Sequence, residues 1–429
     1  MSMLLIFVVL FTLLFLGLPI AFGLGLVAFT GIVMILGPAP AGAMVAQIAF
    51  DTLQNYDLVV LPLFLMMGNF IARSGLAQDL FATSNAFLGH RRGGLAMATI
   101  MACGGFSAVC GSSMATAATM AKVALPPMRS FGYADSLALG SIAAGGTLGI
   151  LIPPSVIMLL YGIMTDTDIG KLFIAGIIPG AVMILSFLVA IAVVTRLNPA
   201  LGRSGERQDW AARLRSLRGV WGVLALFALV LGGIYGGVFT PTEAAGIGAM
   251  GALFFALLTR RMGFGDFTAA VLESVRSSAM MLVLLFGAIL FNNLMELNGF
   301  TGQLSSWIGG LEVNRWVVIW VIIGIYLILG CLLESLSMLL LTIPIFFPAV
   351  AALGFDPVWF GIIVVVVIEI GLVTPPIGLN VFVLAGMFRD VPMATIFRGV
   401  MPFLVAQFVC LALFVFVPQV VTFLPNLMR

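Results

Sequence analysis

Apolar segments of about 20 residues recur from one end of the sequence to the other, and this feature restricts the fold more than any other. Each segment is long enough to cross a hydrocarbon core of ~30 Å as an α-helix. Of the 429 residues, 62% are hydrophobic and 8% are charged, whereas a soluble domain carries about 25% charged residues. The sequence therefore predicts an all-α integral membrane protein that crosses the membrane many times.

The apolar segments predict about ten transmembrane helices and two re-entrant helical hairpins. The predicted helices are 3–17, 20–36, 58–73, 134–165, 170–195, 220–238, 243–259, 278–296, 357–388 and 399–424. We expect the first helix to be retained, because no basic region precedes it and no convincing cleavage site follows it. Two further apolar blocks, 94–125 and 316–348, are interrupted midway by small or polar residues, which is typical of hairpins that enter and leave on one side. Amphipathic segments before each hairpin, 76–89 and 300–310, predict interfacial arm helices.

The basic residues predict the orientation. If 196–218 is cytoplasmic, alternation of the spans puts all but three of the 19 Lys and Arg residues on the cytoplasmic side. The exceptions are Lys171, Arg315 and Arg429. This bias agrees with the positive-inside rule. It places 260–276 inside and 37–57 and both termini outside, with the first hairpin opening to the cytoplasm and the second to the exterior.

A pattern of Pro, Gly and Ser residues in the first half of the sequence recurs in the second half at a constant offset. The matching positions include Pro19 and Pro241, Ser113 and Ser335, Gly149 and Gly371, and the pairs Pro153-Pro154 and Pro375-Pro376. An odd number of crossings separates matching points, so the two halves are inverted in the membrane. Inverted repeats with interrupted helices are typical of secondary transporters, whose binding site lies between the halves near the midplane.

The paired prolines interrupt the predicted spans 134–165 and 357–388. Proline lacks a backbone N–H and clashes with the preceding turn, so nearby carbonyls lose their helical partners. Such backbone is tolerated at membrane depth only inside protein or beside a water-filled cavity. Free carbonyls suit Na⁺, and the N–H groups of the half-helix that follows suit an anion. The predicted Na⁺ ligands here are Gly146, Thr147, Gly149 and Pro153 in the first half and Gly371, Thr374 and Pro375 in the second.

The predicted hairpin tips, at 111–116 and 333–337, supply further candidate ligands. Ser112 and Ser113 at the first tip and Glu334 and Ser335 at the second offer hydroxyl, carboxylate and carbonyl oxygens for Na⁺. Ser and Thr in apolar helices often bond only to their own backbone, but the repeat pairs Ser113 with Ser335. The candidate substrate ligands are Ser113, Ser155, Ser335 and Asn380.

Three acidic residues stand out. Glu334 and Glu369 lie deepest in apolar sequence, and a carboxylate there is a functional hypothesis by default. Glu334 is expected to neutralise a bound cation or to carry a proton, while Glu369 is either functional or a protonated structural acid. Glu243 starts a helix after Thr240-Pro241-Thr242, and its expected role is capping.

The residue inventory argues against most enzyme chemistry. The one histidine, His90, lies in a His-Arg-Arg run, and the four cysteines form no CxxC pair. No P-loop, dinucleotide-binding turn, zinc signature or GxSxG elbow is present. We therefore expect a transporter that is neither an enzyme nor ATP-driven, with no organic cofactor and no nucleic-acid partner.

Four segments resemble the large membrane (M) subunit of the tripartite ATP-independent periplasmic (TRAP) transporters. They are GGVFTPTEAAGIGA (236–249), FSAVCGSSMATAATM (106–120), GTLGILIPPS (146–155) and TPPIGLNVFVLAG (374–386). The resemblance implies an elevator-type carrier of the ion transporter superfamily, driven by Na⁺ in the bacterial inner membrane. It also implies a small four-helix membrane subunit (Q-type) and a periplasmic binding protein that delivers an organic acid such as sialic acid or a C4-dicarboxylate.

Mapped onto this sequence, the resemblance implies a transport unit of 94–165 and 316–388. The scaffold is then 1–93 with the first arm helix, 166–315 with the cytoplasmic linker and the second arm helix, and 389–429. Because the chain starts at the large subunit's first helix, the small subunit is expected on a separate chain. Two alternatives remain open: a stand-alone Na⁺- or H⁺-coupled dicarboxylate carrier, and a membrane-embedded lipid-type transferase.

Overall fold

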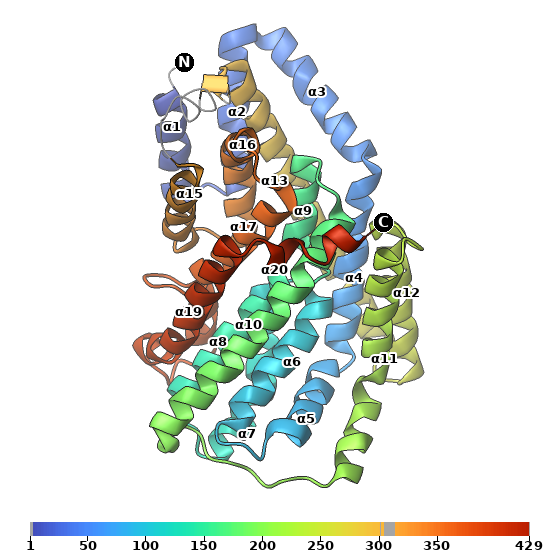
Figure 1. Cartoon of the computed structure of the whole chain (residues 1–429). Coiled ribbons are helices and arrows are strands. Elements are labelled where there is room, and N and C mark those ends of the chain that lie inside the picture. The colour runs from blue at the N-terminus through green and yellow to red at the C-terminus, as the bar shows by residue number, and fades with distance from the viewer. Residues whose placement is uncertain (1–2, 301, 304–313, 429) are drawn as a thin grey trace.

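The computed structural model describes residues 3–300, 302–303 and 314–428, and in these it contains helices, turns and irregular segments but no strand (Figure 1). The first half contains α1 Met3–Phe15, α2 Ile20–Leu36, α3 Pro38–Gln54, η1 Tyr56–Val59, α4 Val60–Arg73, α5 Leu76–Leu88, α6 Gly94–Cys110, α7 Ser113–Ser130, α8 Asp135–Leu151, α9 Val156–Thr165, α10 Ile169–Leu197 and η2 Pro199–Leu201. The second half contains α11 Trp210–Tyr235, α12 Pro241–Leu258, α13 Phe264–Leu297, α15 Arg315–Gly330, α16 Ser335–Ala352, α17 Pro357–Gly371, α18 Leu379–Met387, α19 Met393–Phe416, α20 Gln419–Thr422 and η3 Pro425–Leu427.

The predicted membrane elements are present. Within the described residues, eight helices or helix pairs are long and apolar enough to cross a membrane, and α1, α2, α6, α15 and α17 are shorter apolar helices. The pairs α6–α7 and α15–α16 form the two predicted hairpins, and α8–α9 and α17–α18 are the two broken spans. The first arm helix is α5. The prediction for 300–310 falls almost entirely outside the described residues.

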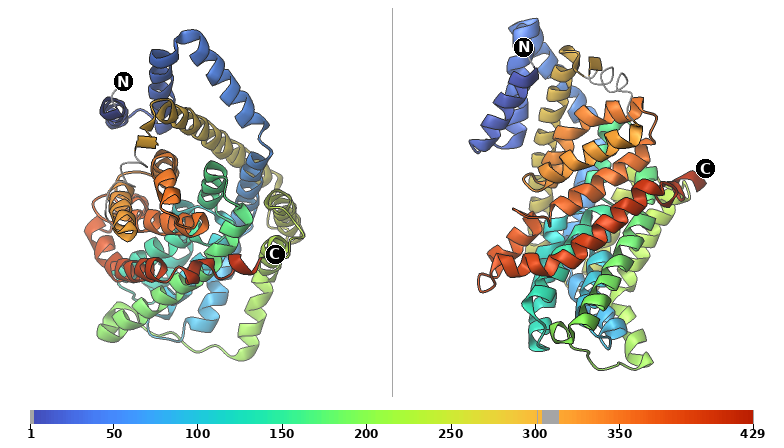
Figure 2. Two further views of the ribbon diagram at one scale, coloured as in Figure 1. Left: turned by 45° about the horizontal axis from the view of Figure 1, so that its top comes forward. Right: turned by 60° about the vertical axis from the view of Figure 1, so that its left-hand side comes forward.

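Two predicted loops are helical instead. Residues 37–57 contain α3, which begins at Pro38 and runs along the outer edge of the molecule (Figures 1 and 2). Most of 260–276 belongs to α13, which begins at Phe264, several turns before the predicted span at 278. Charged residues end an apolar window without ending a helix: Glu273 lies within α13 and pairs with Arg73 at 2.8 Å. A loss of hydropathy along the sequence therefore does not mark the end of a helix.

The structure confirms the repeat. Helix α7 runs from Ser113 to Ser130 and α16 runs from Ser335 to Ala352, so both ends match at the offset found in the sequence. Both interruptions fall at the paired prolines, and both Pro-Pro bonds are cis. Matching Ser and Pro positions in the two halves of the sequence therefore correspond to matching helix boundaries.

The helices pack in two groups. In the first group, α2 and α4 pack on α13, and α4 also packs on α12. Helices α1 and α3 join α2, α11 joins α12, and α5 packs on both α11 and α6. The hairpins and broken helices form the second group together with α10 and α19, and the two groups lie side by side in Figure 2. Helix α19 approaches α8 closely, since a Cβ on Gly399 would lie 1.8 Å from the Ser136 carbonyl oxygen. The hairpin tips lie where the two groups meet.

The charge-based orientation predicts opposite labelling at two exposed positions. Ser204 lies in the linker along the lower edge of Figure 1, and Ala39 lies at the start of α3. In a background without Cys110 and Cys331, Ala39→Cys should react with a membrane-impermeant maleimide in intact cells, whereas Ser204→Cys should react only after permeabilisation. The cysteine-depleted parent is the blank. Labelling of the linker from outside would overturn the orientation.

Candidate functional site

The first hairpin turns within two residues. Gly111 adopts φ +63°, a left-handed conformation that favours glycine, and it ends α6. Ser112 then caps α7, because its hydroxyl accepts a hydrogen bond from the Ala115 N–H at 3.4 Å. Ser113 is the first residue of α7 and is buried. The tip therefore presents two consecutive serines at the start of a helix.

The second hairpin places a carboxylate where the first has a hydroxyl. Glu334 matches Ser112 in the repeat and caps α16 in the same way. One of its oxygens accepts hydrogen bonds from the N–H and the hydroxyl of Ser337, at 3.3 and 3.4 Å. These bonds are long, so they leave much of the acceptor capacity of the carboxylate unused. The two tips are thus equivalent in backbone but different in charge.

Both tips line one cavity, which we call the tip cavity. The space within it, open solvent included, is about 400 Å³. It is lined by 111–114 and 334–336 from the tips, Ile150, Val156 and Ile157 beside the first break, and Leu65 of α4 and Met281 of α13. Four predicted ligands, Ser112, Ser113, Glu334 and Ser335, therefore lie around one space. The sequence did not indicate the contributions of Leu65 and Met281.

The first break is packed tightly against the first tip. A Cβ on Gly149 would lie 2.8 Å from the carbonyl oxygen of Ser112 and 3.1 Å from the N of Ser113. A Cβ on Gly146 would lie 3.1 Å from the carbonyl oxygen of Ser113. Only glycine permits this approach, so the absence of side chains at both positions brings the backbone of α8 onto the tip.

Asn380 joins the two halves at this point. It lies at the start of α18, after the second break, and is fully buried. Its amide donates hydrogen bonds to the Ser113 hydroxyl at 2.8 Å and to the Ala143 carbonyl at 3.2 Å. Its side-chain oxygen has no partner among the described residues. Asn380 therefore contacts the first tip through Ser113 but does not itself line the tip cavity.

The second break is arranged differently from the first. Gly371 packs against Gly330 at the end of α15, where its Cβ would lie 2.6 Å from the Gly330 Cα. The Thr374 hydroxyl donates to the Ile370 carbonyl at 2.6 Å. Pro375 is exposed, whereas Pro153 in the first break is buried. None of the three predicted ligands in this break, Gly371, Thr374 and Pro375, lines the tip cavity.

Two further predicted residues serve local structure. The Thr147 hydroxyl donates to the Ala144 carbonyl at 2.7 Å and accepts from the Gln407 amide of α19 at 3.1 Å, so it points away from the tip. Ser155 caps α9 by accepting from the Met158 N–H at 3.4 Å. Its neighbours Val156 and Ile157 line the cavity, so the N-terminus of α9 begins beside the cavity.

The other two acids singled out in the sequence, Glu243 and Glu369, have different surroundings. Glu243 forms a capping box with Thr240, as predicted, with its carboxylate 2.9 Å from the Thr240 N. Glu369 is fully buried and faces the backbone of Ile150 and Leu151 without a hydrogen bond of normal geometry to any described residue. Glu369 belongs to the second half of the chain but therefore lies beside the break in the first half.

Gln407 is a buried polar residue that the sequence analysis missed. Its amide bonds to Thr147, and its oxygen has no partner among the described residues. The available signal was an amide inside the otherwise apolar span Met393–Phe416.

Unpaired buried oxygens around the first tip fit a hard monovalent cation. Within the described residues, Ser107 Oγ, Thr116 Oγ1 and Asn380 Oδ1 are buried without a hydrogen-bond partner. Ser107 and Thr116 flank the tip in α6 and α7, and Asn380 contacts it. Buried polar atoms are normally satisfied, and uncharged oxygens of this kind are common ligands of hard cations. Each of these atoms is therefore a candidate oxygen ligand for a cation near the first tip.

Sequence comparison identifies the family. Residues 7–420 match the family described as "Tripartite ATP-independent periplasmic transporter, DctM component". The chain belongs to this family of TRAP large permeases. A C4-dicarboxylate TRAP transporter large permease of Pseudomonas aeruginosa is 39% identical over 88% of each chain. An isethionate TRAP transporter permease, DctMQ, of Oleidesulfovibrio alaskensis is 35% identical over 95% of this chain and 64% of its own. These relatives are transporter permeases rather than enzymes.

A solved structure supports the fold independently. The YdaH transporter of Alcanivorax borkumensis superposes with a TM-score of 0.62 at 16% identity, covering 88% of each chain. At this identity the likeness concerns the fold alone. A multi-pass, all-helical transporter of the TRAP large permease family is thus established, and the sequence prediction of family and fold class is confirmed.

Proposed function

We propose that this chain is the Na⁺-coupled permease of a three-part uptake system for a small organic acid in the bacterial inner membrane. The observation that carries the proposal is the convergence of both hairpin tips and the first break on one cavity between the two helix groups. The named relatives transport a C4-dicarboxylate and isethionate, which are small acidic anions. Sialic acid and other carboxylates fit the same class.

The proposed ion sites lie at the two tips. In the first, Ser112, Ser113 and the backbone of α8 supply oxygens, and the unpaired Asn380 Oδ1 adds one from the second half. In the second, Glu334 and Ser335 supply them at the edge of the tip cavity. Glu334 carries the one formal charge among the described residues that line the cavity, so Na⁺ at this tip would be directly neutralised by protein.

The proposed anion site is the tip cavity itself. The described residues that line it include neither Lys, Arg nor His, so an anion there needs charge from bound cations and from the N-terminus of α9. Without Na⁺, Glu334 would repel the anion. Coupling then follows from electrostatics, because anion affinity rises only in the Na⁺-bound state.

We further propose an elevator motion in which the second helix group slides along the first. The packing of α10 and α19 on the broken helices favours a larger moving unit than 94–165 and 316–388 alone. Helix α19 meets α8 through Gly140 and Gly399 without intervening side chains, and α10 packs on α19. We therefore place α10 and α19 in the moving unit. The scaffold is then α1–α5 with α11–α13.

The proposed partners are a separate small membrane subunit and a periplasmic binding protein. DctMQ aligns with this chain over only 64% of its own length, which leaves room for a fused subunit in that relative. Here an apolar groove between α2, α3 and α13 is lined by Phe22, Leu26 and Phe286, and it suits a transmembrane helix of the small subunit.

Uptake into proteoliposomes should require all the parts. The permease with its small subunit and binding protein should accumulate a labelled organic acid under an inward Na⁺ gradient, and omission of either partner should leave negligible uptake at low micromolar substrate. Liposomes with equal Na⁺ on both sides are the control. Robust uptake by the isolated chain would instead favour a stand-alone carrier, and chemical turnover of a lipid substrate would favour a transferase.

A further inference from the structure

Two segments that carry arginines and lie far apart in the sequence are hydrogen-bonded to each other where α5 ends. The Gly93 N–H donates to the Gly202 carbonyl at 3.2 Å, and the Gly205 N–H donates to the Gly89 carbonyl at 2.9 Å. These two backbone bonds hold the linker between α10 and α11 along the turn between α5 and α6. Both segments carry arginines, and we call these residues the basic patch: Arg91 and Arg92 in the turn, Arg203 and Arg207 in the linker, and Arg213 at the start of α11.

The positive charge of the basic patch is not neutralised within the described part of the chain. The four salt bridges found there involve Arg73, Arg129 and Arg261 instead. The nearby Asp209 carboxylate caps α11 by accepting from the Ala212 N–H at 2.9 Å, and Glu206 forms no ion pair with a described residue. The pKa of His90 is lowered by burial and then by the charges of Arg213, Arg207 and Arg91. A surplus of positive charge therefore acts at this end of the molecule.

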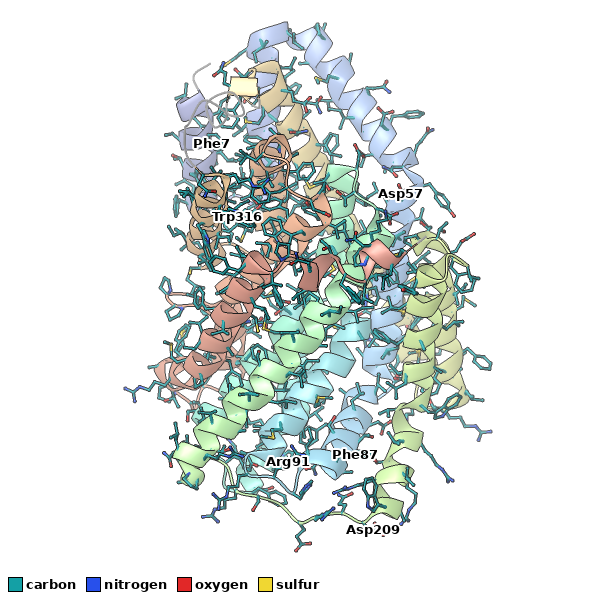
Figure 3. All side chains as sticks on the ribbon, viewed as in Figure 1. Phe7, Asp57, Phe87, Arg91, Asp209 and Trp316 are labelled. Carbon is teal, nitrogen blue, oxygen red and sulfur yellow. The ribbon has the colours of Figure 1, made fainter. Side chains whose placement is uncertain are left out.

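Arg213 anchors the basic patch. Its Nε donates to the Ala86 carbonyl at 3.1 Å, at the C-terminal end of α5. Its guanidinium lies over the Trp210 ring, 5.0 Å from the centroid, and 5.9 Å from that of Phe87. It is 5% exposed, and its Nη2 has no partner in the described residues. Figure 3 shows Phe87, Arg91 and Asp209 gathered at this end. The arginine thus fixes α11 to α5 and keeps an unused donor.

Exposed apolar side chains flank the basic patch. Trp210 is 64% exposed and Leu214 is 61% exposed at the start of α11, and Leu197 is 81% exposed at the end of α10. Both helices continue into apolar spans. Charged and apolar groups side by side fit a lipid, whose headgroup and acyl chain meet both, better than a soluble polyanion, which would leave the apolar groups in water.

We propose that the basic patch binds the phosphate of anionic phospholipids in the leaflet that it faces. Bound headgroups would neutralise arginines that form no ion pair in the described part of the chain, and they would hold α5 and the start of α11 at the membrane surface. Helix α5 packs on both α6 and α11, so the lipid would brace the scaffold on which the first hairpin rests. The proposal is independent of the transported substrate.

The test measures thermal stability of the purified chain in neutral detergent with added lipid. Phosphatidylglycerol should raise the Tm of the wild type by about 3 °C or more above phosphatidylcholine, as expected for a few charge contacts near a surface. The double variant Arg91→Gln with Arg207→Gln should lose most of this shift and keep its folded yield, since both side chains are exposed. Added salt should reduce the wild-type shift.

A matched double variant serves as the control. Arg260→Gln with Arg276→Gln removes the same charge from exposed positions on the same predicted side, and it should retain the shift. Equal loss in both double variants would overturn the proposal, because net charge alone would then explain the effect. An equal Tm shift with inorganic phosphate or polyphosphate would overturn the assignment to lipid.

Discussion

Replacing Gly149 by alanine is expected to reduce Na⁺-driven uptake about tenfold or more. The new Cβ would lie 2.8 and 2.9 Å from the O and C of Ser112 and 3.1 Å from the N of Ser113. All three are backbone atoms, so the first tip must move away from α8. Overpacking of this kind costs about 1–3 kcal/mol, and about 1.4 kcal/mol is a factor of ten. The measurement is initial uptake against Na⁺ concentration, normalised to folded protein.

Gly386→Ala is the matched control for this variant. Gly386 lies in α18, in the same helix group, and its Cβ would meet no described atom within 4 Å. It should therefore keep wild-type uptake and stability. If Gly149→Ala also kept wild-type Na⁺ dependence, the close approach of break and tip would have no part in ion coupling.

Much of the fold was predictable because the membrane imposes strong rules on sequence. A span must be apolar over a fixed length, and a pair of prolines within such a span interrupts its helical hydrogen bonding. The pairs Pro153-Pro154 and Pro375-Pro376 therefore located both broken helices. The helix α3 and the start of α13 were missed because neither has the continuous apolar length by which spans are recognised, and a helix needs no such length to form.

The site was only partly predictable, because the repeat describes each half and not how the halves meet. Symmetry correctly brought Ser113 and Ser335 to equivalent tips. It gave no sign that Asn380 would reach the first tip across 267 positions of sequence. Thr147 and Glu369 are also equivalent in the repeat, yet Thr147 turns to Gln407 and Glu369 faces the opposite break. Such contacts depend on the packing of the two halves, which hydropathy does not encode.

The contact between Asn380 and Ser113 should set the Na⁺ dependence of transport. Asn380→Leu keeps the volume but removes the donor to Ser113 Oγ, at 2.8 Å, and the unpaired Oδ1. Loss of a buried hydrogen-bonding partner costs about 1–3 kcal/mol, so the half-saturating Na⁺ concentration should rise about tenfold. Ser113→Ala and Ser335→Ala should act in the same direction and alter docking of the binding protein less. Sodium-induced Tm shifts provide a readout that does not depend on transport.

Gln407→Leu is the control that separates ion binding from general destabilisation. It removes a buried amide-to-hydroxyl bond of the same kind, at 3.1 Å to Thr147, but this bond reaches α8 on the side that faces α19 and does not touch the first tip. It should lower the Tm comparably and leave the half-saturating Na⁺ concentration nearly unchanged. Equal Na⁺ shifts in Asn380→Leu and Gln407→Leu would show that α8 responds to any loss of packing. Undiminished uptake on a proton gradient without Na⁺ would refute the two-site sodium hypothesis outright, because the oxygens at the tips would then have no cation to hold.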